Sequence, residues 1–255
     1  MAALMGEWRR RGSSCSGALV LWLKDMLPGA GLGVIDDRGE PKVAYYYLKR
    51  ALAPVAVWMT DEGVNGIAVH IANDRSEPVR ARLRVGLYRD LEARVAEGTE
   101  ELELPARSTV QRTVEGLLGR FVDAAWAYRF GPPSQDAIFA TLERSEEPSQ
   151  ILSRSALFPA GLPATRQPPA RLGLEAEARA DAGDGATVRV RTHAVAYGVR
   201  VKAPGFRPDD DSFSLEPGGE QLVRLTPASP HAKFVGAMLT ALNLEGAVSV
   251  PRGQG

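Results

Sequence analysis

The feature that most constrains this chain is a single strand, loop and helix pattern at residues 15–54. The apolar run Ala18–Leu23 is short and ends on the polar pair Lys24-Asp25, which is typical of a buried parallel strand. After a glycine-containing loop, a helix is predicted to begin at Pro41 and to end before Pro54. A strand with polar residues at its carboxyl end, followed by a loop and a helix, is the repeating unit of a (β/α) barrel. Because one such unit cannot close a barrel, the rest of the chain must fold in another way.

Downstream of Pro54 the pattern changes to short runs in which apolar and polar residues alternate, separated by turn signals. This spacing favours two antiparallel β-sandwiches, and the proline-containing stretch 146–172 between them is predicted to be a linker or crossing segment. The predicted strands are Gly66–Asn73, Pro78–Tyr88, Glu101–Leu104, Thr109–Val114, Trp126–Phe130, a closing strand with Ile138, Phe139 and Leu142, then Leu174–Ala180, Thr187–Thr192, Tyr197–Lys202, Gln221–Leu225, Ala237–Leu244 and Ala247–Val250, with a hairpin turn at Ala182–Gly185 and a frayed tail from Arg252.

Composition excludes several classes of partner. Lys+Arg and Asp+Glu are balanced at 31 each, so no excess of basic residues predicts binding to nucleic acid or to an anionic membrane. No apolar run approaches the roughly 20 residues of a membrane span, and the N-terminus lacks the residue order of a secretory signal, so we expect a cytoplasmic protein. Cys15 is the only cysteine, which excludes an intrachain disulfide. The 3 histidines lie far apart without ligand spacing, so we expect neither a metal nor another cofactor.

Four other motifs have ordinary structural interpretations. Gly29–Gly33 lacks the Lys-Ser/Thr of a phosphate-binding loop, so we predict a loop that needs positive φ. Asp209–Asp211 lacks the spaced ligands of a calcium loop and is predicted to be an acidic turn. One carboxylate of Asp61-Glu62 is expected to cap the backbone of its turn. The basic run Arg9–Arg11 is expected to be a solvated helix end.

Trp22 and Asp25 are the candidate substrate-binding residues. A tryptophan at the end of a barrel strand would face the catalytic mouth, where an aromatic face packs on a sugar ring and a carboxylate binds its hydroxyl groups. Plain core filling is an equally good interpretation of Trp22 from spacing alone.

Taken together, residues 15–25, 28–36 and 39–47 resemble the last strand, loop and helix of the barrel in glycoside hydrolase family two, in particular its β-mannosidase branch. The tryptophan of that family's strand would fall on Leu21, one place before Trp22. Adjacent strand residues face opposite sides, so the register decides whether Leu21 or Trp22 meets the sugar. Residues 53–74 are similar to the start of the sandwich that follows this barrel, and residues 208–218 to part of the terminal sandwich. The resemblance implies a mainly β chain. Its parts would be the last β/α unit of a (β/α)8 barrel over 1–54, an immunoglobulin-like sandwich over 55–145, the linker, and a second immunoglobulin-like sandwich over 173–255.

The resemblance also implies a function, and it implies that the catalytic residues for this function are missing from the chain. Retaining glycosidases of this kind hydrolyse O-glycosyl bonds in carbohydrate catabolism with two carboxyl groups roughly 5 Å apart. The resemblance places both as glutamates on earlier barrel strands, upstream of Met1, so we expect no catalytic residue here and no β-mannosidase activity from this chain alone. Joined to the rest of a barrel, or associated with a barrel-bearing chain, it would bind a β-mannoside or related glycan. The alternative is a stand-alone β-sandwich module that binds carbohydrate or a protein partner.

Overall fold

The computed structural model describes residues 1–15, 17–181 and 184–252. The chain divides into two compact units. The first contains residues 1–25, 30–34 and 47–162, and the second contains residues 26–29, 35–46 and the described residues from Pro163 onward. Each unit contains a mainly β structure with two antiparallel sheets, so the predicted pair of β-sandwiches is confirmed.

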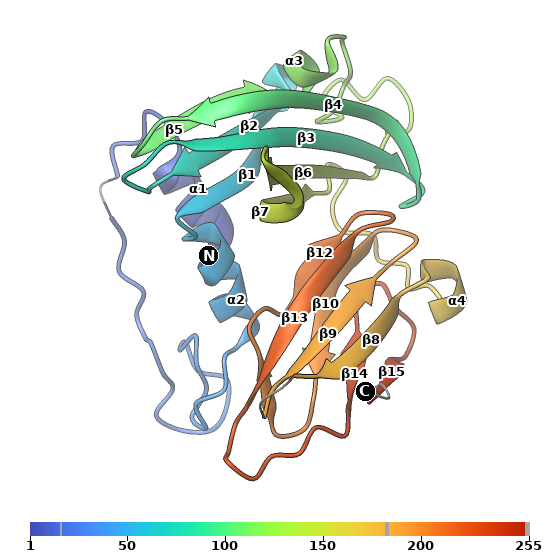
Figure 1. Ribbon diagram of the computed structural model, residues 1–255. Coiled ribbons are helices and arrows are strands. Elements are labelled where there is room, and N and C mark those ends of the chain that lie inside the picture. The colour runs from blue at the N-terminus through green and yellow to red at the C-terminus, as the bar shows by residue number, and fades with distance from the viewer. Residues whose placement is uncertain (16, 182–183, 253–255) are drawn as a thin grey trace. The chain divides into compact units, whose positions relative to one another are not determined.

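The first sandwich packs a three-stranded sheet, in the order β1-β2-β5, on a four-stranded sheet in the order β4-β3-β6-β7. In Figure 1 the long strands β3 and β4 curve side by side. Three short helical segments accompany these strands. The elements are α1 (Ala2–Arg9), β1 (Val55–Asp61), η1 (Gly63–Asn65), β2 (Ile67–Asn73), β3 (Val79–Arg89), β4 (Ala93–Leu104), β5 (Ser108–Thr113), α3 (Val114–Leu118), β6 (Ala137–Arg144) and β7 (Glu147–Leu157).

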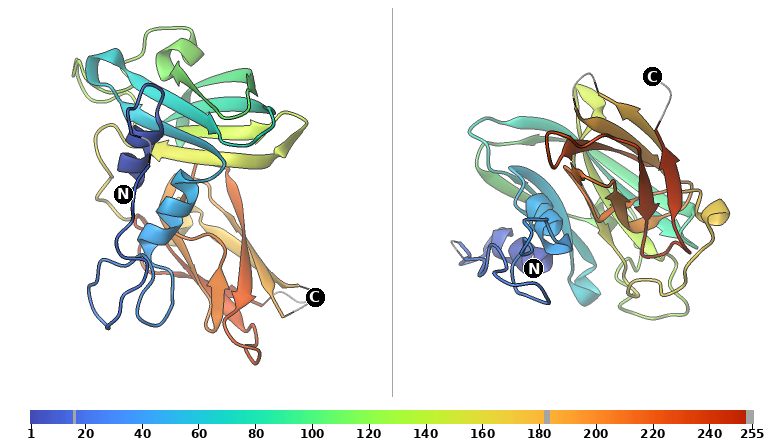
Figure 2. Two further views of the ribbon diagram at one scale, coloured as in Figure 1. Left: turned by 90° about the vertical axis from the view of Figure 1, so that its left-hand side faces the viewer. Right: turned by 90° about the horizontal axis from the view of Figure 1, so that it is seen from below.

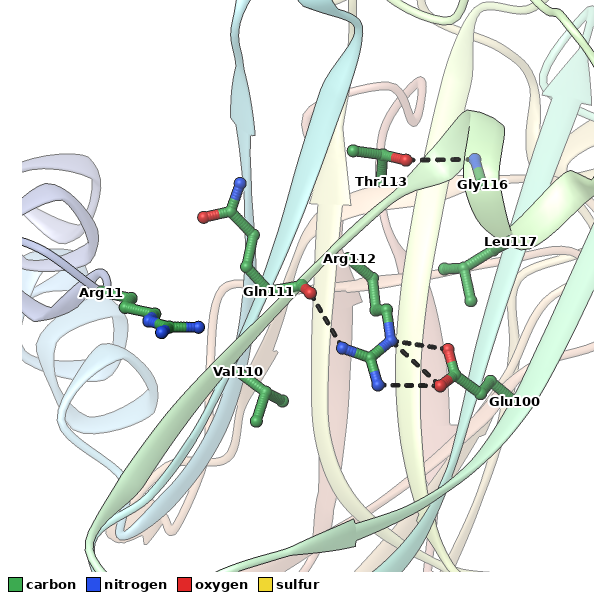
Figure 3. Close-up of a pocket in the computed structure, with 8 residues that line it drawn as sticks. All are labelled: Arg11, Glu100, Val110, Gln111, Arg112, Thr113, Gly116 and Leu117. Carbon is green, nitrogen blue, oxygen red and sulfur yellow. Dashed lines mark hydrogen bonds and ion pairs between the residues drawn. The ribbon is translucent and has the colours of Figure 1, made fainter.

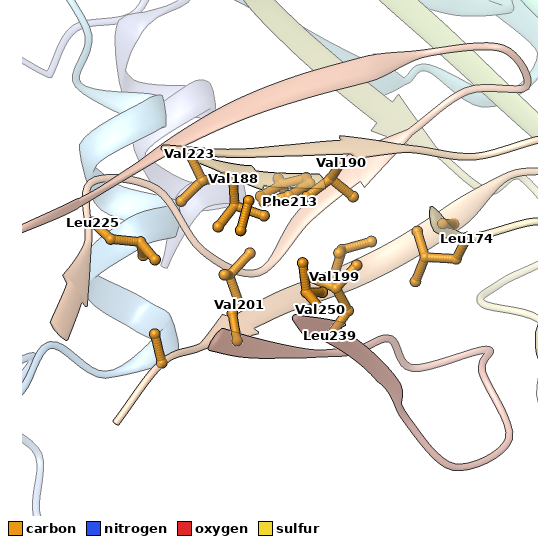
Figure 4. Close-up of a cluster of buried hydrophobic side chains, with 14 of the residues drawn as sticks. Leu174, Val188, Val190, Val199, Val201, Phe213, Val223, Leu225, Leu239 and Val250 are labelled. Carbon is orange, nitrogen blue, oxygen red and sulfur yellow. The ribbon is translucent and has the colours of Figure 1, made fainter. Parts of the chain in front are cut away.

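The second sandwich packs the sheet β11-β13-β9-β8 on the sheet β12-β10-β14-β15. Figure 4 shows the valines and leucines of these strands meeting between the two sheets, where Val188, Val199 and Leu239 are 0% exposed. The elements are α4 (Pro169–Leu172), β8 (Glu175–Ala180), β9 (Ala186–Arg191), β10 (Ala196–Lys202), β11 (Phe206–Pro208), β12 (Phe213–Leu215), β13 (Glu220–Pro227), β14 (Gly236–Thr240) and β15 (Val248–Pro251). The turn predicted at Ala182–Gly185 and the tail from 253 onward lie partly or wholly outside the described residues.

The predicted helix after Pro41 is confirmed as α2 (Val43–Ala51), and the boundary between the units falls inside it. Residues 35–46 belong to the second unit, where the Tyr46 hydroxyl donates to the Pro208 carbonyl at 3.3 Å. Burial of this ring is the main reason that the pKa of Tyr46 rises to about 12. Glu40 adds an ion pair with Arg207 at 2.8 Å, so two contacts fasten this segment to the second sandwich.

The acidic run Asp209–Asp211 is a structural turn, as predicted. The Asp211 carboxylate is buried and accepts the Val201 amide and the Arg200 guanidinium, both at 2.9 Å. Asp209 accepts the Arg224 amide at 2.9 Å. The bond from Val201 satisfies a backbone donor that would otherwise be buried without a partner. In the first unit, Asp61 caps the amide of Gly63 at 2.8 Å, which confirms the capping prediction for that turn.

The basic run at the end of α1 differs from the prediction of a solvated helix end. Arg9 makes an ion pair with Asp74 at 2.7 Å, and its side chain is only 16% exposed. Arg10 makes an ion pair with Glu62 at 3.0 Å. Both carboxylates lie next to strands of the first sheet, so the arginines tie α1 to the sandwich. The prediction was wrong for Arg9 and Arg10, because the helix lies against a folded partner that supplies acidic groups.

Three predicted elements are corrected by the structure. Residues 147–157 form β7, which pairs with β6, where we expected a linker. Residues 126–130 are a loop where we expected a strand, because the turn signals around them outweigh the alternation. The run Ala18–Leu23 is not a strand either, and Figure 2 shows this part of the chain without arrows. No described strand pairs with residues 18–23, and an isolated strand leaves its backbone groups without partners.

Candidate functional site

The run Ala18–Leu23 exposes apolar side chains that we expected to be buried. Leu19 is 100% exposed, Leu21 74% and Leu23 68%. Trp22 is 53% exposed, and the peptide bond between Leu21 and Trp22 is cis. Contiguous exposed apolar surface on a folded domain usually marks a place where another molecule binds. Both Leu21 and Trp22 are exposed here, so either side chain is accessible to a ligand.

Asp25 is buried in the loop that follows this run. Its carboxylate accepts the Gly33 amide at 2.6 Å, and the residue is 7% exposed. A Cβ atom at Gly31 would lie 2.2 Å from Oδ1 of Asp25, and one at Gly33 would lie 2.5 Å from it. At Gly33 a Cβ atom would also lie 2.6 Å from the backbone nitrogen of Asp25, so glycine is required there, whereas a side chain at position 31 would force the Asp25 carboxylate to move. The predicted need for positive φ holds at Gly29 alone, where φ is 132°.

Trp22 and Asp25 thus occupy different environments, one exposed and one buried, in the same unit. Asp25 already holds the loop closed, which is a structural role that spacing alone did not reveal. Their role in binding a substrate remains a prediction.

A groove of about 640 Å³ opens in the first unit beside the free edge of β5. Figure 3 shows its lining, in which the Arg112 guanidinium binds both carboxylate oxygens of Glu100 at 2.8–3.0 Å. This pair joins β5 to β4 of the other sheet. Arg11 points toward the groove and makes no hydrogen bond or ion pair with any other described residue. The other lining residues are Val110, Gln111, Thr113, Gly116 and Leu117.

The groove offers polar groups suited to a polar ligand, namely a guanidinium, an amide and a hydroxyl, together with the apolar side chains of Val110 and Leu117. Sequence reasoning did not identify it. Its residues come from the turn after α1, from β4, and from β5 with α3, and no spacing along the chain brings these segments together.

A buried polar cluster lies under α1 on the outer side of the first sheet. His70 is 1% exposed, stacks on the Trp58 ring with centroids 5.3 Å apart, and places Nε2 at 2.8 Å from the Thr60 hydroxyl. Burial is the main cause that lowers the pKa of His70, so the neutral ring is favoured. In the described part of the chain, no group of three or more His, Cys, Asp or Glu side chains is placed to hold a metal ion. The contacts with Trp58 and Thr60 hold the His70 ring in this position.

None of the helices in the described ranges is both long and apolar enough to cross a bilayer.

Comparison with known proteins gives consistent results in sequence and in fold. The chain is 24% identical over 240 residues to Beta-mannosidase B of Aspergillus niger, an alignment that covers 86% of this chain and 26% of that protein. A second alignment, to Beta-mannosidase B of Thermothelomyces thermophilus, is 40% identical over 55 residues, which is 21% of this chain and 6% of that protein. No protein-family model matches the chain.

The fold resembles solved glycosidase structures. The β-D-mannosidase of Dictyoglomus thermophilum superposes with a TM-score of 0.72 at 18% identity, covering 96% of this chain and 28% of that protein. The exo-chitosanase CsxA of Amycolatopsis orientalis gives a TM-score of 0.68 at 16% identity, covering 98% of this chain and 32% of that protein. The chain thus spans about a quarter to a third of the length of the long relatives it matches. These findings confirm the resemblance to the C-terminal part of β-mannosidase-like proteins of glycoside hydrolase family two.

Proposed function

We propose that this chain serves as the C-terminal portion of a β-mannosidase-like glycoside hydrolase, which cleaves O-glycosyl bonds in carbohydrate catabolism. The observation that carries the proposal is the alignment of 86% of the chain with 26% of a β-mannosidase. The strand order β1-β2-β5 against β4-β3-β6-β7 supports an immunoglobulin-like assignment for the first sandwich. The predicted cytoplasmic location and the absence of a nucleic-acid partner are kept as part of this proposal.

In this proposal, the N-terminal segment is the closing β/α unit of the catalytic barrel. Barrel strands are buried on both faces, so their sequences are nearly continuous apolar runs. The run Ala18–Leu23 has that composition but lacks a strand partner among the described residues, and its leucines are exposed. The helix α2 follows at the place that a barrel unit requires. Strands supplied by a barrel-bearing chain would provide the missing backbone partners and cover these leucines.

Trp22 and Asp25 would then lie at the rim of the sugar site. The exposed Trp22 ring offers a flat face to the apolar side of a pyranose. Asp25 would act chiefly by holding the loop 25–33 in the shape that its bond to Gly33 defines. Leu32, where the family usually carries an aromatic residue, is 76% exposed and leaves one wall of that site thinner.

The catalytic pair would come from outside this sequence. A retaining mechanism needs an acid/base and a nucleophile, both carboxyl groups, on opposite sides of the scissile bond. Glu7 is not a candidate for either role, because it lies in α1 and contacts Arg10 at 3.3 Å. We therefore expect the purified chain to release no p-nitrophenol from p-nitrophenyl β-mannoside, and measurable release would contradict this part of the proposal.

A second candidate function is a stand-alone β-sandwich module that binds carbohydrate or a protein. The observation that favours it is that each sandwich has its own closed apolar core. The DNA just upstream of Met1 separates the two functions. An in-frame or adjacent reading frame for a barrel with glutamates at strand ends would support the hydrolase, and co-expression of its product with this chain should then yield mannosidase activity. A promoter and ribosome-binding site with no such frame would support the module.

A further inference from the structure

The loop between α3 and β6 presents three aromatic rings to solvent. Phe121 is 73% exposed, Tyr128 42% and Phe130 91%. Tyr128 lies between the other two, with both ring-centroid distances equal to 5.8 Å. It meets Phe121 edge-on at 63° and stacks on Phe130 at 15°. Tyr128 thus joins two further exposed rings into one contiguous aromatic surface, and exposed apolar surface of this kind often marks a binding site.

Hydrogen bonds from two side chains hold this loop in one shape. The Asp123 carboxylate accepts the amides of Ala127 at 2.8 Å and Tyr128 at 3.0 Å. The Gln135 side chain, which is 0% exposed, donates to the carbonyls of Asp123 and Ala124, both at 3.0 Å. Ala124 is also 0% exposed and belongs to the core of the sandwich. The loop is therefore fixed to the core of the sandwich, and the three aromatic rings that it carries are pre-organised for a ligand.

The backbone of the loop is held in a conformation that residues with side chains rarely adopt. Trp126 has φ of 52° and Arg129 has φ of 53°. The Trp126 indole donates to the Gly131 carbonyl at 3.0 Å, and the Arg129 guanidinium lies 5.2 Å from the centre of the same ring. Such strained positions persist only where surrounding contacts fix them, and they are common at ligand-binding sites.

The size of the aromatic surface bears on what binds there. At about 200 Å² for a whole aromatic side chain, the exposed parts of the three rings offer roughly 400 Å². A standard protein–protein interface covers about 800 Å² on each partner, which is about twice as much. The flanking residues Arg120 and Arg129 are exposed and polar, so they do not extend the apolar surface. The surface is small for a stable protein interface and large enough for one or two sugar rings.

We propose that Phe121, Tyr128 and Phe130 form a carbohydrate-binding platform for neutral, β-linked oligosaccharides. A pyranose has one apolar face that packs on an aromatic ring and a rim of hydroxyl groups that bind polar side chains, here the guanidinium groups of Arg120 and Arg129. The choice of ligand class rests on the proposed glycosidase function. The platform itself uses none of the residues assigned to the barrel segment, so it would hold a glycan by a second contact.

The test is a titration of the purified full chain with β-1,4-linked mannohexaose, followed by calorimetry and by amide chemical shifts. We expect saturable binding, with the shifts concentrated at residues 121–131. Phe130→Ala and Phe121→Ala should each weaken binding at least fivefold without changing the far-UV circular dichroism, because both rings are exposed. Leu222→Ala, which removes a 51% exposed apolar side chain from β13, is the matched control and should bind as the unaltered chain does.

Three results would overturn the platform. The first is the absence of binding at about 10 mM oligosaccharide, because a Kd above that concentration is too weak for a useful binding site. The second is binding that both variants leave unchanged. The third combines two observations: the chain binds no oligosaccharide, and the two variants no longer co-purify with a barrel-bearing chain. This result would make the surface a protein interface. Binding is measured on this chain alone, so a chain that binds the oligosaccharide but gains no hydrolytic activity with any partner would refute the proposed function and keep the platform.

Discussion

Strand β2 and the run Ala18–Leu23 have similar apolar compositions and opposite environments. All seven residues of β2 are buried, and Ile67, Val69 and Ile71 are 0% exposed. In the other run, by contrast, Leu19, Leu21 and Leu23 are between 68% and 100% exposed. Both segments were predicted to be strands, and only β2 is one.

The difference lies in the neighbours. Strand β2 pairs with β1 on one edge and with β5 on the other, so its backbone groups are hydrogen-bonded on both sides and its side chains reach the core. No described strand borders residues 18–23. An apolar run therefore indicates which segment can enter a sheet, whereas the presence of partner strands decides whether it does. The run at 18–23 lacks such a partner in this chain.

The largest expected effect tests this comparison directly. Ile71→Ala removes three buried carbon atoms from β2 and should lower the free energy of unfolding by about 2–5 kcal/mol, the usual range for such cavities. Leu21→Ala removes a similar volume from an exposed side chain and should change the same quantity by less than about 0.5 kcal/mol. Urea unfolding followed by tryptophan fluorescence is a suitable measurement, because all 4 tryptophans lie in the first unit.

A comparable loss of stability in both variants would mean that residues 18–23 are packed in solution. The comparison between β2 and this run would then fail.

The same contrast explains how much of the fold the sequence predicts. Alternation located β2, β3, β5, β9, β10 and β13 within a few residues, because each of these strands pairs with a neighbouring strand within the chain. It missed β7, where proline and serine precede Ile151 and Leu152, because pairing with β6 outweighs the local turn signals. It also placed a strand at 126–130, where Asp123 and Gln135 bind the backbone into a loop instead.

The candidate sites were less predictable than the strands. Asp25 was identified as a polar residue at the end of an apolar run, and spacing could not show that its carboxylate packs against Gly31 and Gly33. The aromatic platform could not be predicted from the sequence for a similar reason. Trp126, Tyr128 and Phe130 alternate as a strand would, and the side chains of Asp123 and Gln135, which hold them on a loop, lie outside that pattern.

An effect of intermediate size is expected from a substitution in the loop 25–33, which follows the exposed run. The bond between Asp25 and Gly33 orders this loop, although the leucines before it are exposed. Gly33→Ala would place a Cβ atom 2.5 Å from Oδ1 of Asp25 and 2.6 Å from its backbone nitrogen. Overpacking of this kind costs about 1–3 kcal/mol, so the bond from residue 33 to Asp25 should open more often. Hydrogen exchange at the amide of residue 33 should then be about 10- to 100-fold faster, since each 1.4 kcal/mol corresponds to a tenfold change.

Gly17→Ala is the matched control, because a Cβ atom there has no neighbour within 4 Å and the backbone has no positive φ. It should leave exchange at residue 33 unchanged. Unaltered exchange in Gly33→Ala would show that the carboxylate of Asp25 does not hold this loop.

The smallest effect on stability is expected from the double substitution Leu21→Ser and Leu23→Ser. Both side chains are mostly exposed, so replacing them removes little buried apolar area and should shift the unfolding free energy by less than about 0.5 kcal/mol. Self-association should fall, because the substitution breaks up a contiguous exposed apolar patch. Analytical ultracentrifugation over a range of concentrations measures this change, and Leu222→Ser in β13 serves as a control for removing an isolated exposed leucine.

If the run is a barrel strand without its neighbours, the double variant should also fail to associate with a barrel-bearing chain. A variant that associates as well as the original would show that this run is not the surface through which such a chain binds.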